Sequence, residues 1–296
     1  MTAFTLPQPK SLLRLSDLTL LGVAVVWGTS YGVAKGALAF YPVLGFLAVR
    51  FILTFVLLLP ALLRAKGRQR VDAVRADLPL GALMLGIFLC ETFGVAHTQA
   101  SNAAFLISLC VVFTPFVQWW LLGSRPARAV FVFAGISLLG AALLSGGLAG
   151  QFGLGDGLML AAAVLRAFTV CLTSRLTRQS GAPALLLTAV QAGVIGFGSL
   201  LLALFMPGGL PPLPLESAFW LASAYLVLGC TVFAFFAQNW ALQRTSPSRV
   251  ALLTSSEPAF GALFAVLWLG EGLSAAGWLG GGLIVAAALW TTVRRG

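Results

Sequence analysis

Residues 43–63 read VLGFLAVRFILTFVLLLPALL, and Arg50 is the only charged residue among them. As an α-helix this run would be about 30 Å long, which matches the hydrocarbon core of a bilayer. Further long apolar runs occupy residues 18–34, 129–144 and 182–205. Because these runs are continuous and do not alternate with polar residues, they predict membrane-spanning helices and not the strands of a barrel.

The composition of the whole chain agrees with a membrane protein. Hydrophobic residues make up 59% of it and charged residues only 9%, whereas a soluble domain carries about 25% charged residues. The net charge of +10 could indicate nucleic-acid binding, but the basic residues fall in short segments between the apolar runs. That placement is typical of membrane orientation. We therefore expect the lipid bilayer, and no nucleic acid, as a partner.

The apolar runs predict an all-α protein with ten transmembrane helices. We expect them at residues 18–38, 43–63, 78–97, 101–122, 127–146, 155–176, 183–205, 218–242, 247–269 and 275–293. With ten spans, most of the basic residues fall on one side of the membrane, and an odd number of spans would scatter them. These residues are Lys10, Arg14, Arg64, Lys66, Arg68, Arg70, Arg75, Arg125, Arg128, Arg175, Arg178, Arg244, Arg249, Arg294 and Arg295.

The acidic residues agree with this topology. Asp156, Glu216 and Glu271 lie in the segments that face the other side. By the positive-inside rule, both termini lie in the cytoplasm. We expect a multi-pass protein of the bacterial inner membrane.

Two similar halves, residues 1–148 and 149–296, divide the chain. SNAAFL at residues 101–106 aligns with SRVALL at residues 248–253, an offset of 147, and Ser108 then aligns with Ser255. At an offset of 139, Asp17 aligns with Asp156. Five helices in each half would place the halves in opposite orientations. Such inverted repeats around a central cavity are a recurring architecture of secondary transporters.

Several short motifs together resemble the EamA-type transporters of the drug/metabolite transporter superfamily, over nearly the whole chain. The motifs are WGTS at residues 27–30, RF at 50–51, TQASNAAF at 98–105, RTSP at 244–247, EP at 257–258 and LGE at 269–271. The resemblance implies ten helices around a central cavity, and transport of small organic solutes, often the export of amino acids or other metabolites. This chain has Arg166 where the family often has an aromatic residue in the sixth helix.

Ionisable residues inside the predicted spans are the first candidates for a site, because a charge at the bilayer centre costs at least about 2.5–3.5 kcal/mol on insertion scales. Arg166 could present its guanidinium to a substrate carboxylate or phosphate. It could equally form a structural ion pair with Glu91 or Glu257. Glu91 could bind substrate or act as a protonatable carrier, unless Arg166 or Arg50 neutralises it.

The remaining candidates for coupling or gating are Glu257, Pro258 and Arg50. Proline removes a helix donor, so the Glu257–Pro258 pair predicts a kinked or broken helix, with either a structural or a gating role. Arg50 lies early in its helix, so its side chain could instead reach the outer interface.

The softer candidates for substrate binding are Trp27, Gln191, Gln238 and Asn239. An aromatic ring in mid-span could stack on a solute, and amides could bind polar groups. The four cysteines lack CxxC spacing, so we expect no metal and no cofactor. No GxxxxGK[ST] motif for nucleotide binding is present either.

The sequence therefore predicts a secondary transporter and not an enzyme. It would export a small-molecule solute such as an amino acid by alternating access, as a monomer or homodimer. An intramembrane lipid-modifying enzyme and a lipid scramblase remain the alternatives.

Overall fold

The computed structural model describes residues 10–98, 100–146, 152–180, 183–207, 209–269 and 272–293. Within these ranges the chain forms helices and no strand. Three residues that enter the topology prediction, Glu271, Arg294 and Arg295, lie outside the described ranges.

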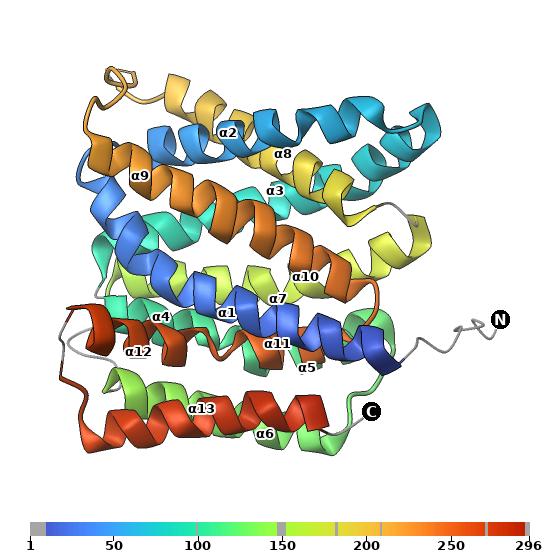
Figure 1. Cartoon of the computed structure of the whole chain (residues 1–296), viewed down its shortest axis with the longest axis vertical. Helices are drawn as coiled ribbons and strands as arrows, with labels where there is room; N and C mark the ends of the chain where they lie inside the picture. Colours follow the sequence, from blue (N-terminus) through green and yellow to red (C-terminus); the bar gives the residue numbers. More distant parts are fainter. Residues whose placement is uncertain are drawn as a thin grey trace.

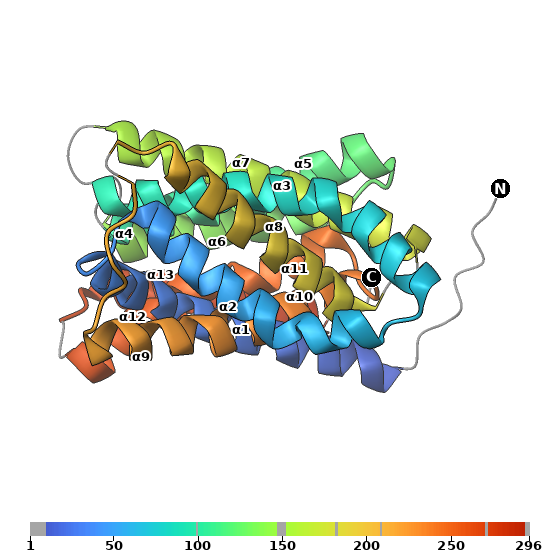
Figure 2. The ribbon, with the colours of Figure 1, turned by 90° about the horizontal axis from the view of Figure 1, so that it is seen from above.

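The helices run side by side along one common direction (Figure 1). Their bounds are α1 (Lys10–Leu38), α2 (Val43–Arg64), α3 (Gly67–His97), α4 (Ala100–Ser108), α5 (Cys110–Leu122), α6 (Arg128–Ser145), α7 (Leu154–Ser180), α8 (Ala184–Leu204), α9 (Ser217–Tyr225), the π-helix η1 (Leu226–Phe233), α10 (Ala234–Leu242), α11 (Pro247–Thr254), α12 (Glu257–Leu269) and α13 (Ala275–Val293). In Figure 1, α2 and α8 lie at one edge of the bundle and α6 with α13 at the other. Seen from above in Figure 2, α1 and α9 lie on the opposite side from α7.

In the described part of the chain, seven helices are long and apolar enough to cross a membrane. They are Leu15–Leu38, Val43–Arg64, Asp77–His97, Phe105–Leu122, Leu154–Thr177, Ala184–Leu204 and Ser217–Leu242. Two shorter apolar helices cover Arg128–Leu144 and Ala275–Trp290. Large apolar side chains such as Leu215, Phe205 and Trp120 are exposed on the bundle, as a lipid-facing surface requires. The count of ten spans and the inverted relation of the halves stay predictions.

The start of α3 differs from the sequence prediction. Residues 64–75 were expected to form a basic loop, but α3 begins at Gly67, so Arg68, Arg70 and Arg75 lie on its first turns. Arg70 explains why the helix extends beyond its apolar part. Its guanidinium donates to the carbonyl oxygens of Leu62 and Leu63 at 3.0 and 2.6 Å, and these carbonyls at the end of α2 lack partners within that helix.

Two predicted spans, residues 101–122 and 247–269, are each divided into two helices. The second break, at residues 255–256, follows from the Glu257–Pro258 pair, because Pro258 has no N–H to donate to the carbonyl of Thr254. The first break, at Leu109, lies at the equivalent position under the offset of 147. There the Leu109 amide donates three residues back, to Leu106, in a tighter turn.

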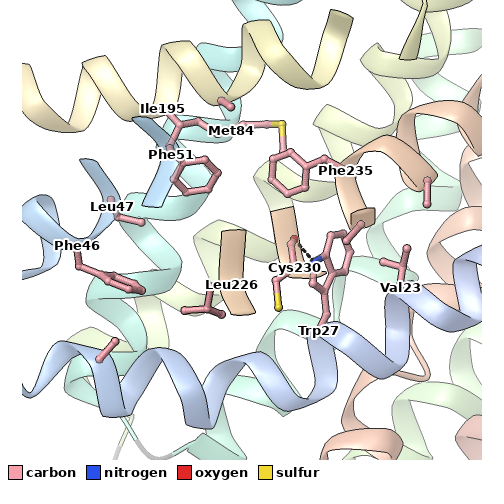
Figure 3. Packing of buried hydrophobic residues seen from close by; sticks show 14 of the residues in the cluster. Val23, Trp27, Phe46, Leu47, Phe51, Met84, Ile195, Leu226, Cys230 and Phe235 are labelled. Carbon is pink, nitrogen blue, oxygen red and sulfur yellow. Dashed lines mark hydrogen bonds between the residues drawn. The ribbon is translucent and has the colours of Figure 1, made fainter. Parts of the chain in front are cut away.

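A buried aromatic cluster joins α1, α2, α3, α8 and the α9–η1–α10 segment. Phe51 packs edge-on against Phe88 with ring centroids 4.7 Å apart, and Phe235 lies within 6.1 Å of Phe51. Figure 3 shows Phe51, Met84 and Ile195 close together, with Trp27 on the far side of Phe235. This cluster forms one wall of the central cavity.

A close approach between α1 and α12 sets the position of that wall. A Cβ atom on Gly28 would lie 2.5 Å from the carbonyl oxygen of Glu257 and 2.7 Å from the amide nitrogen of Gly261. Only glycine therefore allows α1 to contact α12 where α12 begins.

We expect Gly28→Ala to lower the thermal unfolding temperature of the protein in detergent, because overpacking costs about 1–3 kcal/mol. Gly32→Ala is the matched control on the same helix, since nothing lies within 4 Å of a Cβ there, and alanine favours a helix. Equal unfolding temperatures for the two variants would contradict the close approach.

Candidate functional site

A central cavity of about 60 Å³ lies in the middle of the bundle. A cavity needs about 10–15 Å³ of such volume to hold one water molecule, so this cavity has room for roughly four to six waters. Its lining combines four charged residues with aromatic, polar and aliphatic ones. They are Arg50, Glu91, Arg166, Glu257, Trp27, Phe88, Phe235, Ser30, Thr169, Gln238, Met84, Ile87 and Val170.

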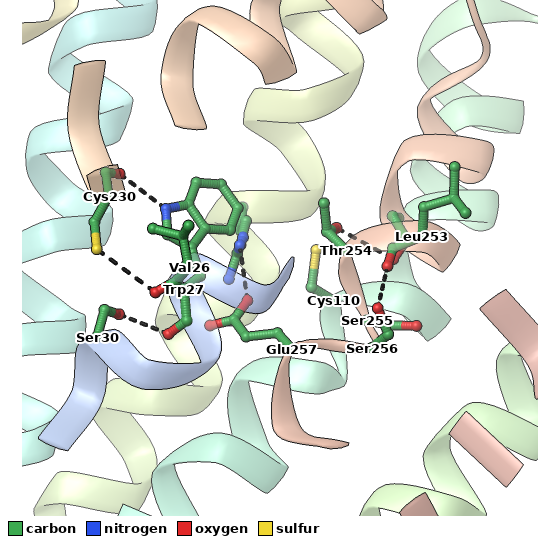
Figure 4. A network of polar contacts seen from close by, with 12 residues as sticks. Val26, Trp27, Ser30, Cys110, Cys230, Leu253, Thr254, Ser255, Ser256 and Glu257 are labelled. Atoms are coloured by element: carbon green, nitrogen blue, oxygen red, sulfur yellow. Dashed lines mark hydrogen bonds and ion pairs between the residues drawn. The ribbon is translucent and has the colours of Figure 1, made fainter. Parts of the chain in front are cut away.

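An ion pair between Arg166 and Glu257 forms one side of the cavity. The Nη2 atom of Arg166 lies 3.3 Å from Oε2 of Glu257, and both side chains are largely buried. The dashed line from Glu257 in Figure 4 marks this pair. Of the alternatives open from the sequence, the structure pairs Arg166 with Glu257, yet it also exposes the guanidinium to the cavity.

The indole ring of Trp27 packs against the Arg166 guanidinium. The centre of the guanidinium lies 4.5 Å from the centroid of the Trp27 ring, a cation–π distance. The indole Nε1–H in turn donates to the carbonyl oxygen of Cys230 at 2.9 Å (Figure 4). The orientation of Arg166 is therefore tied to α1 and to the π-helix.

Arg50 is a cavity residue, and the interpretation that it reaches the outer interface is wrong. Its side chain is buried, and its Nε–H donates to Oγ1 of Thr231 at 3.0 Å. Its guanidinium also lies 5.1 Å from the Phe51 ring centroid and 5.5 Å from that of Phe88. Position along the helix could not reveal which face of α2 packs against α9, η1 and the rest of the core.

The π-helix is a feature that sequence reasoning missed. The hydroxyl of Thr231 donates to the carbonyl of Leu226, five residues back, at 2.9 Å. π-Helical turns often occur at functional sites. Here the widened turn presents Thr231 to Arg50 and the Cys230 carbonyl to Trp27. Its sequence, LVLGCTVF, is apolar apart from Thr231 and gives no periodic signal for this geometry.

Glu91 of α3 also lines the cavity, one turn after Phe88, and is partly buried. Tyr31 is buried within electrostatic reach of both Glu91 and Glu257. The cavity therefore contains two guanidinium groups and two carboxyl groups, so charges of both signs face one small space.

A second cavity of about 20 Å³ lies on the other side of the Arg166–Glu257 pair, which lines both spaces. Ser108, Cys110 and Ser255 belong to its lining. Ser108 and Cys110 flank the first helix break, and Ser255 lies in the second. The ends of α4 and α11 and the starts of α5 and α12 therefore converge here. Pro258, predicted for coupling or gating, lines this second cavity and not the central one.

The other predicted residues divide between two places. Trp27, Gln238, Arg166 and Glu91 line the central cavity, as do Arg50 and Glu257. Gln191 and Asn239 do not belong to that lining. They form a separate buried group with Thr188 and Asp77, which we call the Asp77 cluster.

A chain of hydrogen bonds connects the Asp77 cluster, with Asn239 donating to Gln191 and Gln191 donating to Asp77. Asn239 Nδ2 donates to Thr188 Oγ1 at 3.2 Å and to Gln191 Oε1 at 3.0 Å. Gln191 Nε2 then donates to Oδ1 of Asp77 at 3.1 Å. Sequence reasoning missed Asp77 because it precedes the predicted span 78–97 by one residue and so counted as part of a loop.

Two carboxylates connect elements near the ends of the bundle. Asp17 of α1 accepts from Nε and Nη2 of Arg249 on α11, at 3.0 and 2.7 Å. Asp156 of α7 accepts from the hydroxyl of Thr98, directly after α3, at 2.6 Å. Asp17 and Asp156 are the two residues that the internal repeat aligns.

Comparison with known proteins supplies the family. The sequence profile of the EamA-like transporter family matches residues 14–146 and again residues 153–293. An uncharacterized transporter of Archaeoglobus fulgidus is 29% identical over 290 residues, covering 94% of this chain and 86% of the relative. The uncharacterized inner membrane transporter YedA of Escherichia coli K12 is 28% identical over 283 residues, covering 93% and 89%.

A solved crystal structure supports the fold. It superposes with a TM-score of 0.77 at 20% identity, covering 96% of this chain and 97% of that chain. At this level of identity the likeness concerns the fold alone.

Thr231→Val should lower the thermal unfolding temperature, because it removes the acceptor for the buried Arg50 guanidinium while keeping the side-chain volume. An unsatisfied buried polar group costs about 1–3 kcal/mol, and more when charged. Thr19→Val is the control, since that hydroxyl only donates to the Ser16 carbonyl within its own helix. An unchanged unfolding temperature for Thr231→Val would show that Arg50 does not depend on the π-helix.

Proposed function

This chain belongs to the EamA-like transporter family, and on that premise we propose that it is a secondary transporter that exports a small zwitterionic metabolite, such as an amino acid, by alternating access. Membrane transport is the function that the family and the named relatives share. The substrate class, the direction of transport and the mechanism are our proposal.

The single observation that carries the substrate class is the presence of both charge signs in one small cavity. Arg166 offers a guanidinium, which binds a carboxylate through two parallel hydrogen bonds. Glu91, on the same lining, offers a carboxylate to an ammonium group. Trp27 and Phe235 offer apolar surface to a side chain. The volume of about 60 Å³ limits the substrate to a small one.

Binding would require an exchange of partners at Arg166. A substrate carboxylate on this guanidinium competes with Glu257, whose Oε2 already lies 3.3 Å from it. Release of Glu257 would act directly on the break at residues 255–256, because Glu257 is the first residue of α12. A ligand shifts a conformational equilibrium only through a difference in affinity for the two states. Replacement of Glu257 by the substrate carboxylate at Arg166 would supply this difference in affinity.

The two end contacts fit alternating access between inverted halves of the chain, residues 1–148 and 149–296. We propose that Asp17–Arg249 closes the cytoplasmic end and Thr98–Asp156 the external end, with both termini in the cytoplasm of a bacterial inner membrane. The alignment of Asp17 with Asp156 supports this reading, since equivalent carboxylates would then act on opposite faces. Rocking of one half against the other would open one contact at a time.

We expect Arg166→Ala to reduce saturable counterflow in proteoliposomes about 10-fold or more, because hydrogen bonds to a charged group contribute about 1.5–3 kcal/mol. A thermal-shift screen of amino acids, nucleosides and organic acids first identifies the solute, since a ligand of the folded state raises its apparent stability. Arg175→Ala is the control, because that side chain is exposed and donates to the Leu121 carbonyl. Unchanged flux in Arg166→Ala would remove Arg166 from the binding site.

Glu91→Gln should weaken binding of the zwitterion, because Glu91 offers a carboxylate to the ammonium group, and the same variant tests whether Glu91 also carries a proton. The measurement is initial uptake at several external pH values in proteoliposomes. If the pH dependence of uptake persists in Glu91→Gln, Glu91 is excluded as the proton carrier and is at most a binding residue.

A further inference from the structure

The Asp77 cluster contains a carboxyl group whose environment the central cavity does not explain. Asp77 is fully buried, and its Oδ2 atom has no hydrogen-bond partner in the described structure. Its Oδ1 atom accepts from Gln191. A carboxylate in this setting lacks the paired charge that burial requires, so the group needs a ligand that neutralises it.

The charged side chains that the structure describes on the neighbouring elements do not supply that neutralisation. Helix α3 packs mainly against α7 and α8, and more weakly against α1, α2 and α4. Helices α8 and α10, which provide the rest of the cluster, contain no charged residue, nor does α4. Of the described cations on these elements, Arg70 donates to carbonyls of α2, Arg175 to Leu121, Arg50 to Thr231 and Arg166 to Glu257. Lys35, Arg64, Arg68 and Arg75 are exposed. The side chains of Lys10, Arg14 and Arg178 lie outside the description.

The acidic groups are also remote or engaged. On α3 itself, Asp72 is half-buried and precedes the apolar part of the helix, and Glu91 lies about 21 Å away along the helix axis. Asp17 is paired with Arg249, and Asp156 accepts from Thr98. Like-charge repulsion from a close neighbour therefore does not act on Asp77.

The direction of the hydrogen bonds favours a proton over a metal cation as the missing ligand. Gln191 turns its amide N–H toward Asp77 and uses its oxygen to accept from Asn239. A hard metal cation beside the carboxylate would need further oxygen ligands, whereas here an amide N–H group faces Asp77. We propose that Asp77 is a proton-binding site, in which the carboxylate takes up one proton from the aqueous phase at this end of the bundle to become a neutral carboxylic acid.

Asp77 lies near the end of the bundle, where the apolar span begins. Asp77 begins the candidate span Asp77–His97, and the neighbouring residues Arg75, Leu78 and Pro79 are exposed. Pro79 has no N–H to donate to the Arg75 carbonyl, so the helical turn around Asp77 is held by one hydrogen bond fewer. Both features place the carboxyl beside the start of the apolar span and not in its middle.

The cluster also connects the proton to the transport site, and this step rests on the proposed function. Gln238, which directly precedes Asn239 on α10, lines the central cavity. α10 continues from η1, whose Thr231 holds Arg50. Uptake or loss of the proton changes the charge of the carboxyl group that accepts the hydrogen bond from Gln191. Because Gln191 in turn accepts from Asn239, this change would alter the contact between α8 and α10.

Infrared difference spectroscopy of the purified full-length protein, titrated with acid and base without solute, tests proton binding directly. We expect a protonated-carboxyl C=O band that is absent in Asp77→Asn and retained in Asp72→Asn and Glu91→Gln. In Gln191→Leu, which keeps the carboxyl, the band should persist to higher pH, because the amide donor that favours the carboxylate is gone. This variant keeps the test open if Asp77→Asn does not fold.

An identical band in wild type and folded Asp77→Asn, or no shift in Gln191→Leu, would overturn the proposal. A band that responds to sodium at fixed pH, with choline as the replacement cation, would assign the site to a metal ion and also overturn it.

Proteoliposomes with an internal pH dye then test coupling. Asp77→Asn should abolish solute-driven proton movement while solute counterflow continues, and proton movement that continues would overturn coupling through Asp77. Absence of solute flux in the wild type would instead count against the transport proposal, and the infrared result would stand on its own.

Discussion

The ion pair between Arg166 and Glu257 is the interaction on which the centre of the bundle depends. Removing one partner of a buried pair leaves an uncompensated charge and costs about 3–5 kcal/mol, which is a large penalty in a lipid-facing bundle. The pair is also held in place from outside, because Trp27 lies against the guanidinium and Gly28 lets α1 approach the first residue of α12. One turn of α1 thus positions both members.

The broken helices follow from this arrangement. A continuous helix through residues 247–269 would place Glu257 and Pro258 inside a regular hydrogen-bonded turn. Pro258 does not fit such a turn, because it has no N–H to donate. The break puts Glu257 in the first turn of α12, where a negative charge is favoured by the helix dipole. The equivalent break before Cys110 has no acidic residue. The two halves therefore share a backbone feature but only one of them has the charge.

The sequence predicts the parts of this structure that depend on hydropathy. Residues 43–63 form α2 almost as expected, and the Glu257–Pro258 pair correctly indicates a break. It could not predict contacts that depend on which helices become neighbours. Arg50 is buried because α2 packs against η1, and Asp77 is buried because α3 packs against α7 and α8. Arg70 extends α3 by capping α2, which no window of hydropathy detects, since the signal lies in the partner helix.

The two polar groups of the bundle differ in how their charges are balanced, and this difference gives them different tasks. In the central cavity, guanidinium and carboxyl groups balance one another, so a zwitterion can replace existing contacts without adding net charge. In the Asp77 cluster, the hydrogen bond to the carboxyl comes from the amide of Gln191, and under our proposal the charge of this carboxyl changes by uptake or loss of a proton. Because α3 and α10 contribute to both places, our proposal is that a change of charge at one would alter the packing at the other. Coupling then needs no residue that contacts both ligands.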